Sequence, residues 1–274
     1  MRIGIIGAGN MASAVLSGIV STNKKINICC SDIDEQKLDK IRKTKEVTVT
    51  KDNTIVIDES DIVFLCVKPN IIEKVSNQIR PFLNANQIII SVAAGVTLKT
   101  LERFLGKDKK IIRIMPNLPC LIRKGVIAIK PNRKCKPRDK KLAEKLISSI
   151  GHIVYLNKEG DFDYITALSG SGPAFLAQYL DANLEFAKSK KINVKTAKVL
   201  VFETVVGTVE FLKHTNMEIK HFISMVASPG GTTEAGIKIL KNKNYHKLVR
   251  DSLNAASRKS LIISKNFDSK GKKK

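Results

Sequence analysis

The run RIGIIGAGNMA at residues 2–12 decides the fold of this chain. An apolar strand ends in the pattern G-x-G-x-x-A, and a helix over Met11–Val20 follows at once, which is the context of a dinucleotide-binding unit. Gly7 permits the tight turn, Gly9 lets a pyrophosphate approach the backbone, and Ala12 allows close packing of the helix on the sheet. The free N–H groups and the dipole of the helix N-terminus would hold the phosphates.

Strands and helices alternate from this run to about residue 156. Besides the strand at Arg2–Ile6, we expect strands at Ile26–Cys30, Val47–Thr50 (a weaker strand), Asp61–Val67, Gln87–Val92, Lys110–Met115, Val126–Ile129 and Ile153–Leu156. Besides the helix at Met11–Val20, we expect helices at Asp34–Arg42, Ile71–Phe82, Thr97–Leu105 and Arg138–Ile150. Continuous apolar strands that alternate with helices predict a parallel sheet with helices on both faces.

The pattern changes after about Asp161, where strand-like runs disappear. Helices are expected over Tyr164–Lys190, Val194–His214, Glu218–Val226, Thr232–Lys241 and Tyr245–Ser264. The predicted fold class is therefore α/β followed by all-α: an N-terminal Rossmann dinucleotide-binding domain at 1–158, a C-terminal all-helical domain at 159–264, and a solvated basic tail at 265–274. Apolar residues cover more than one side of the helix at 194–214, so we expect a second subunit to complete this domain as a dimer.

The formal net charge is +23, with 48 Lys and Arg against 25 Asp and Glu. Such a field attracts nucleic acid, anionic lipid or anionic metabolites. Aromatic residues are not interleaved with the lysines and no groove-reading motif appears, so we expect no nucleic-acid partner. The five cysteines show no metal-ligand spacing, which suits reduced thiols and no metal site. No stretch is expected to span a membrane, and the expected location is the cytoplasm.

Asp32 lies 20 residues after Ala12, at the end of the second expected strand. An acidic residue at this spacing binds the ribose 2′-hydroxyl of NAD and repels the 2′-phosphate of NADP. By this rule the chain favours NADH. Two alternatives stay open, because Asp32 could instead cap the next helix, and lysines (Lys24, Lys25 and Lys37) are close in sequence.

A bound nicotinamide implies hydride transfer, so the substrate needs a polarised bond. Carbonyl reduction usually requires a His, Lys or Tyr proton donor, and none of the four His or four Tyr lies in a Gly- or Pro-marked loop. Two small-residue segments remain, at Ser169–Pro173 and at Ser228–Thr233. The second precedes an expected helix, whose N–H groups and hydroxyls would receive a substrate carboxylate. An imine or iminium substrate suits this inventory, because one hydroxyl at its nitrogen suffices.

These residues resemble pyrroline-5-carboxylate reductase along nearly the whole chain. The matching segments are Gly4–Ala12, Asp61–Pro69 (DIVFLCVKP), Ser91–Thr97 (SVAAGVT), Arg113–Pro119 (RIMPNLP), Leu168–Ala174 (LSGSGPA) and Ala227–Thr233 (ASPGGTT). The resemblance implies reduction of Δ1-pyrroline-5-carboxylate to L-proline, the last step of proline biosynthesis, with NADPH or NADH. It also implies helical domains that interlock in a homodimer or a ring of dimers.

Family roles carry over to matching positions. The resemblance implies that Ile6, Gly7, Ala8, Gly9, Asn10, Met11 and Ala12 surround the pyrophosphate, that Asp32 and Asn53 lie by the adenosine ribose, and that Val67, Lys68, Pro69 and Ala94 line the nicotinamide side. It implies that Ser228, Gly231, Thr232 and Thr233 bind the substrate, with the Thr233 hydroxyl, the one expected catalytic group, at the ring nitrogen. The chain departs from the family at Asp32, where relatives that favour NADPH carry Ser or a nearby Arg.

Three other readings compete with this one. A β-hydroxyacid dehydrogenase shares the two-domain plan but requires a catalytic Lys where this chain has Leu176. A reductase that acts on another cyclic imine would need the same kind of site. A dinucleotide sensor without turnover would not need the intact loop at Ser228–Thr233.

Overall fold

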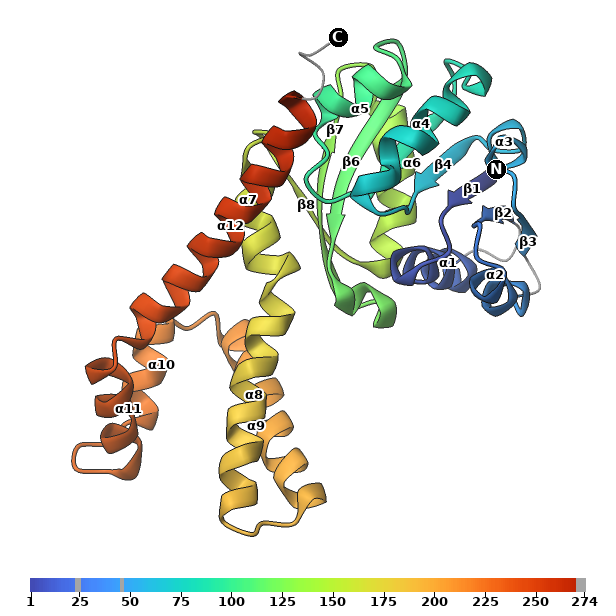
Figure 1. The fold of residues 1–274 in the computed structure, drawn as a ribbon. Coiled ribbons are helices and arrows are strands. Elements are labelled where there is room, and N and C mark those ends of the chain that lie inside the picture. Colours follow the sequence, from blue (N-terminus) through green and yellow to red (C-terminus); the bar gives the residue numbers. More distant parts are fainter. Residues whose placement is uncertain (23–25, 45–46, 270–274) are drawn as a thin grey trace. The chain divides into compact units, whose positions relative to one another are not determined.

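The computed structural model describes residues 1–22, 26–44 and 47–269. Contacts divide the chain into two units, one formed by 1–171 with the chain's end from Ala255, the other by Gly172–Asn254. The fold class predicted from the sequence, a dinucleotide-binding α/β half and an all-helical half, is confirmed (Figure 1). The boundary drawn at residue 158 stays a prediction.

The first unit holds an eight-stranded sheet in the order β3-β2-β1-β4-β5-β6-β7-β8. All neighbouring strands run parallel except β6 and β7, an antiparallel pair that the alternating pattern did not predict. The strands are β1 (Arg2–Ile6), β2 (Asn27–Ser31), β3 (Val47–Thr50), β4 (Ile62–Leu65), β5 (Ile88–Ser91), β6 (Lys110–Pro116), β7 (Gly125–Pro131) and β8 (Gly151–Tyr155).

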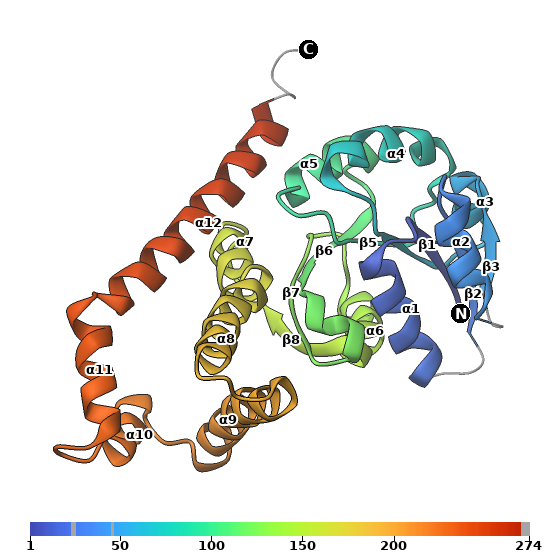
Figure 2. The same ribbon diagram turned by 60° about the horizontal axis from the view of Figure 1, so that its bottom comes forward.

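Helices cover both faces of this sheet, as the buried, continuously apolar β4 and β5 require. One core cluster joins the sheet to α1, α2 and α6, and a second joins the other face to α3, α4 and α5. Figure 2 shows α4 and α5 along one face and α1 and α6 along the other. The helices are α1 (Asn10–Thr22), α2 (Glu35–Arg42), α3 (Asn53–Asp58), α4 (Ile72–Ile79), α5 (Leu98–Leu105) and α6 (Pro137–Ile147).

The remaining helices are α7 (Asp161–Ile165), α8 (Gly172–Ser189), α9 (Val194–Thr215), α10 (Ile219–Val226), α11 (Thr232–Asn242) and α12 (Tyr245–Ser269). The expected single helix over Tyr164–Lys190 is interrupted by a π-helical turn at Thr166–Gly170, closed by the Ser171 N–H on the Thr166 carbonyl. None of the helices in the described parts of the chain is long and apolar enough to cross a membrane.

The end of α12 belongs to the first unit and is tied to it by polar contacts. The Asp268 carboxylate accepts hydrogen bonds from the hydroxyls of Thr97 (2.9 Å) and Thr100 (2.6 Å) at the start of α5. Nearer the middle of the helix, the Ser260 hydroxyl donates to the buried Asp163 carboxylate at 2.6 Å. Residues 265–269, expected in a solvated tail, are therefore helical and anchored, while 270–274 lie outside the described residues.

Candidate active site

The loop after β1 is shaped by its two glycines. Gly7 has φ +99°, and a Cβ there would lie 2.6 Å from the carbonyl oxygen of Cys66, so only glycine fits. Its N–H donates to the Ser31 carbonyl at 2.7 Å. A Cβ built on Gly9 meets no atom within 4 Å, so open space faces the backbone there. The loop is thus held against the neighbouring strands at Gly7 and left accessible at Gly9.

The start of α1 offers unpaired donors beside this open space. The N–H of Ala8 donates to Asp32, and that of Ser13 closes the first helical turn on the Gly9 carbonyl. Among the described residues, no group accepts from the N–H groups of Gly9, Asn10 and Met11, as is usual for the first residues of a helix. Free donors, the helix dipole and the missing Cβ fit a dinucleotide pyrophosphate.

Sheet order points to the same place. The chain adds β2 and β3 on one side of β1 and continues with β4 on the other, so the order reverses between β1 and β4. Ligands of open α/β sheets bind at this switch point, outside the carboxyl ends of the strands. The carboxyl ends of β1 and β4 join where the Cys66 N–H donates to the Ile6 carbonyl at 2.8 Å.

Asp32 directly follows β2, and both of its oxygens are engaged by backbone. Oδ2 accepts from the Ala8 N–H at 2.7 Å, and Oδ1 accepts from the Asp34 N–H at 2.9 Å. The N-cap of α2 is Asp34, whose side chain accepts from the Lys37 N–H, so Asp32 is not the capping residue. This excludes one of the two alternatives left open by the sequence.

Asn53 lies at the start of α3, after β3. Its side-chain oxygen accepts from the Ser31 hydroxyl at 2.6 Å, and its amide donates to Gln78 at 2.9 Å. Ser31 was missed by the sequence reasoning, although it also receives the Gly7 N–H. The signal was its place between the last apolar residue of β2 and Asp32, where a small polar side chain can join two loops.

The residues expected beside the nicotinamide follow β4 and β5. Val67 and Pro69 are half-buried and Lys68 is exposed. Val67 contacts the position that a Cβ on Gly7 would take, at 3.1 Å. Ala94 is half-buried in the turn between β5 and α5. All four therefore lie at the same carboxyl edge of the sheet as the Gly7 loop.

The loop before α11 is a second candidate binding segment, and it lies in the helical unit. Gly230 has φ +73°, and its N–H donates to the Glu234 carboxylate at 2.8 Å. The N-cap is Gly231, not a threonine, and no side chain caps the helix. In the described structure no group accepts from the N–H groups of Thr232 and Thr233. The start of α11 can therefore receive a carboxylate. Thr233, whose hydroxyl is the expected catalytic group, is the second residue of this helix.

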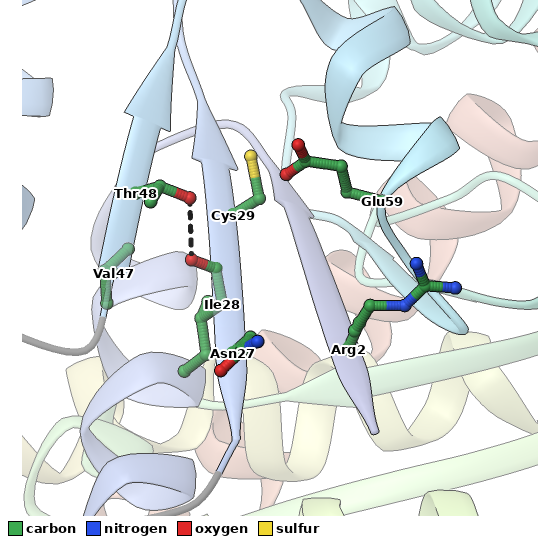
Figure 3. Close-up of a pocket in the computed structure, with 7 residues that line it drawn as sticks. All are labelled: Arg2, Asn27, Ile28, Cys29, Val47, Thr48 and Glu59. Carbon is green, nitrogen blue, oxygen red and sulfur yellow. Dashed lines mark hydrogen bonds between the residues drawn. The ribbon is translucent and has the colours of Figure 1, made fainter.

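A hollow lies elsewhere on the sheet (Figure 3). Its volume is about 480 Å³, and it lies at the first residues of β1, β2 and β3, opposite the edge that carries the Gly7 loop. The Thr48 hydroxyl there donates to the Ile28 carbonyl, and burial raises the pKa of the Cys29 thiol. Since ligands of such sheets bind at carboxyl ends, this hollow is not the dinucleotide site.

Two family models match the chain. One, described as pyrroline-5-carboxylate reductase dimerisation, matches residues 159–262. The other, described as NADP oxidoreductase coenzyme F420-dependent, matches residues 2–95. The two matches fall on the helical half and on the first part of the sheet.

Relatives match the chain over nearly its whole length. A pyrroline-5-carboxylate reductase of Pseudomonas aeruginosa is 33% identical over 263 residues, covering 96% of both chains. One of Aquifex aeolicus is 34% identical over 260 residues, covering 95% of this chain and 96% of that protein. The crystal structure of Plasmodium falciparum pyrroline carboxylate reductase with NADP bound has a TM-score of 0.88 and 28% identity, covering 96% and 98% of the two chains.

Proposed function

Because the chain belongs to the pyrroline-5-carboxylate reductase family, we propose that the Gly7 loop binds the cofactor and that the loop before α11 binds the substrate. The chain is an NAD(P)H-dependent oxidoreductase that reduces pyrroline-5-carboxylate to proline, in proline biosynthesis. The observation that carries the site proposal is the start of α11, where unpaired N–H groups stand beside the Thr233 hydroxyl.

The cofactor side of the site is built by the carboxyl ends of β1, β2, β4 and β5. We assign the pyrophosphate to residues 6–12, the ribose to Asp32 and Asn53, and the nicotinamide side to Val67, Lys68, Pro69 and Ala94. When bound, NAD(P)H supplies the hydride that reduces the C=N carbon of the substrate. The residues hold and orient the dinucleotide, and none of them donates a proton.

The substrate side is assigned to Ser228, Gly231, Thr232 and Thr233. The N–H groups of the last two receive the substrate carboxylate, helped by the positive end of the α11 dipole. The Thr233 hydroxyl contacts the ring nitrogen, accepting a hydrogen bond if this nitrogen is protonated and donating one if it is not. Hydride adds to the C=N carbon, and the π pair becomes a lone pair on nitrogen. For the protonated iminium this neutralises the positive charge and gives the secondary amine directly, whereas the neutral imine must also take one proton at nitrogen, from solvent through the Thr233 hydroxyl.

The chain self-associates through its dimerisation domain. Within the helical unit, α8 and α9 pack on each other but bury only Ala187 and Ala197 of their residues. Large apolar side chains stay exposed along both helices, among them Phe175, Leu176, Val199, Leu200, Val206 and Val209. A monomer would leave this surface in water at a high cost, so we propose a homodimer or a ring of dimers as the working form.

We also propose that the enzyme works in the cytoplasm. All five cysteines are free thiols and four are buried, which suits a reducing compartment. Burial raises the pKa of Cys30 to about 12 and that of Cys135 to about 11, so both behave as apolar core residues.

The test is turnover by the purified chain. Pyrroline-5-carboxylate is supplied with NADH or NADPH, oxidation of the cofactor is followed by its absorbance, and proline is identified by chromatography. We expect cofactor oxidation and proline in equal amounts. A folded, associated preparation that oxidises neither cofactor with this substrate would refute the activity, and the larger ring homologue of the substrate then tests for another cyclic imine.

A further inference from the structure

The start of α2, next to the ribose position of the proposed cofactor site, is locally acidic in a strongly basic chain. Three carboxylates gather there, and we name Asp32, Asp34 and Glu35 the acidic rim. The rim lies at the carboxyl end of β2, where a dinucleotide places its adenosine ribose. The acidic rim contrasts with the formal net charge of +23 of the whole chain.

Asp32 is fixed in place within this rim. The N–H of Ala8 holds one oxygen and the N–H of Asp34 holds the other, and the side chain is 12% exposed. A carboxylate has about four lone-pair sites, so each oxygen can accept a second hydrogen bond. Asp32 can therefore accept from a ribose hydroxyl without moving, but it cannot turn away from a phosphate.

In the described part of the chain, the three cations that contact the rim are paired with its carboxylates. The Lys37 ammonium lies 3.1 Å from the Asp34 carboxylate and 3.9 Å from that of Asp32. The hydrogen bond between Lys37 and Asp34 raises the pKa of Lys37 and lowers that of Asp34. Arg42 and Lys51 both pair with Glu35, at 2.8 Å and 2.9 Å.

Arg42 also pairs with Asp39, so these ion pairs join three cations to four carboxylates. A 2′-phosphate placed beside Asp32 would meet the carboxylates of the acidic rim, and the cations paired with them are already engaged. It would have to take a cation from a carboxylate, and the released carboxylate would repel it. Lys24 and Lys25, close in sequence, lie outside the described residues.

We propose that this enzyme uses NADH in preference to NADPH, and that Asp32 is the residue that determines the choice. The inference rests on the proposed cofactor site. It sets the chain apart from the Plasmodium falciparum relative, whose structure holds NADP. Asp32 accepts the ribose hydroxyl of NADH, while the acidic rim excludes the additional phosphate of NADPH.

The first test measures binding without turnover. Calorimetry on the full chain compares AMP with adenosine 2′,5′-bisphosphate, which differ only by the 2′-phosphate that distinguishes the two cofactors. A parallel titration compares NADH with NADPH. We expect NADH to bind at least about tenfold more tightly than NADPH, which corresponds to about 1.4 kcal/mol, and kcat/KM to follow the same order. Equal or tighter binding of NADPH would overturn the proposal.

Two variants with the same charge change separate Asp32 from its surroundings. D32S removes the ribose acceptor, so NADH binding weakens, NADPH binding strengthens, and their ratio shifts by about tenfold or more. D34S removes one charge from the same rim and keeps an N-cap residue, so the ratio shifts by less than about threefold. Equal shifts in both variants would mean that general charge, not Asp32, sets the preference.

Failure of this proposal and failure of the proposed function give different results. If pyrroline-5-carboxylate is reduced at least as efficiently with NADPH as with NADH, the function stands and the inference falls. If neither cofactor is oxidised but NADH still binds more tightly, the inference stands and the reaction was wrong.

Discussion

The guanidinium of Arg113 on β6 and the carboxylate of Glu159 after β8 form an ion pair with an N–O distance of 2.6 Å. Arg113 is 3% exposed and stacks on the Phe162 ring at 3.9 Å. The same oxygen of Glu159 accepts from the Leu98 N–H at 3.0 Å, at the start of α5. One carboxylate thus connects the sheet to the helix that follows the expected nicotinamide turn.

We expect E159Q to destabilise the chain by about 2 kcal/mol, below the usual range for a broken buried pair because Glu159 is 30% exposed. The substitution leaves Arg113 charged and buried beside a neutral amide, without an opposite charge. Urea unfolding at fixed protein concentration measures the change. The matched control is R2Q, which removes an exposed pair with Asp61 and should change the stability by less than about 0.5 kcal/mol. Equal losses of stability in E159Q and R2Q would mean that the buried ion pair contributes no more than the exposed one.

The two glycines of the first loop should respond differently to alanine. G9A places a methyl group in open space, so we expect unchanged stability but cofactor affinity reduced at least about tenfold, because the methyl group blocks the pyrophosphate. G7A should cost about 2 kcal/mol or more in stability, since its φ is positive and Cys66 leaves no room. Unfolding curves and cofactor titrations distinguish the two, with G160A as a control at another open position. Normal cofactor binding by G9A would mean that the pyrophosphate does not bind at this loop.

The role of Thr233 is tested by T233V, which keeps the shape of the side chain and removes the hydroxyl. We expect kcat to fall roughly a hundredfold, because the contact at the substrate nitrogen is lost, while cofactor affinity stays the same. Steady-state kinetics with a separate cofactor titration measures both. The control is T48V, which removes a hydroxyl bonded to the Ile28 carbonyl far along the sheet from the Gly7 loop. If T233V turns over like the control, the hydroxyl has no part in the reaction.

Stability in acid should depend on Asp139. Its side chain is 6% exposed and accepts from the Lys136 N–H at 2.8 Å and from the Lys110 ammonium at 3.0 Å. Burial alone would raise the pKa of Asp139, but these two partners outweigh it and lower the pKa below its ordinary value. The ionised form is therefore stabilised in the folded state.

The sign of the pH effect follows from this lowered pKa. The contribution of Asp139 is fully present above the ordinary aspartate value of about 3.9 and is lost as the pH falls through the lower folded-state pKa. D139N should therefore be less stable at neutral pH and should lose less further stability below about pH 4. Urea unfolding across this range shows it. Parallel curves for the two proteins would mean that the Asp139 pKa is the same in both states.

Much of the fold could be predicted because strands and helices alternate over a long stretch of the chain and because the strands are buried. The run at residues 2–12 and the alternating elements after it identified the sheet half, and the loss of strand patterns identified the helical half. The short α3 was missed because six residues show too little periodicity. The π-helical turn at Thr166–Gly170 was missed because the sequence pattern stays helical through it.

What the sequence determined by itself is local: the turn that only Gly7 allows, the helix starts at Met11, one residue after the observed start, and at Thr232, and an acidic residue at the end of the second strand. Tertiary structure alone decided the relations between distant segments. It paired Arg113 with Glu159, turned β7 antiparallel to β6, and anchored Asp268 on Thr97. It also paired the cations around Asp32 with carboxylates. Local conformation follows from the residue types within one turn, whereas these pairings depend on which surfaces the packed core brings together.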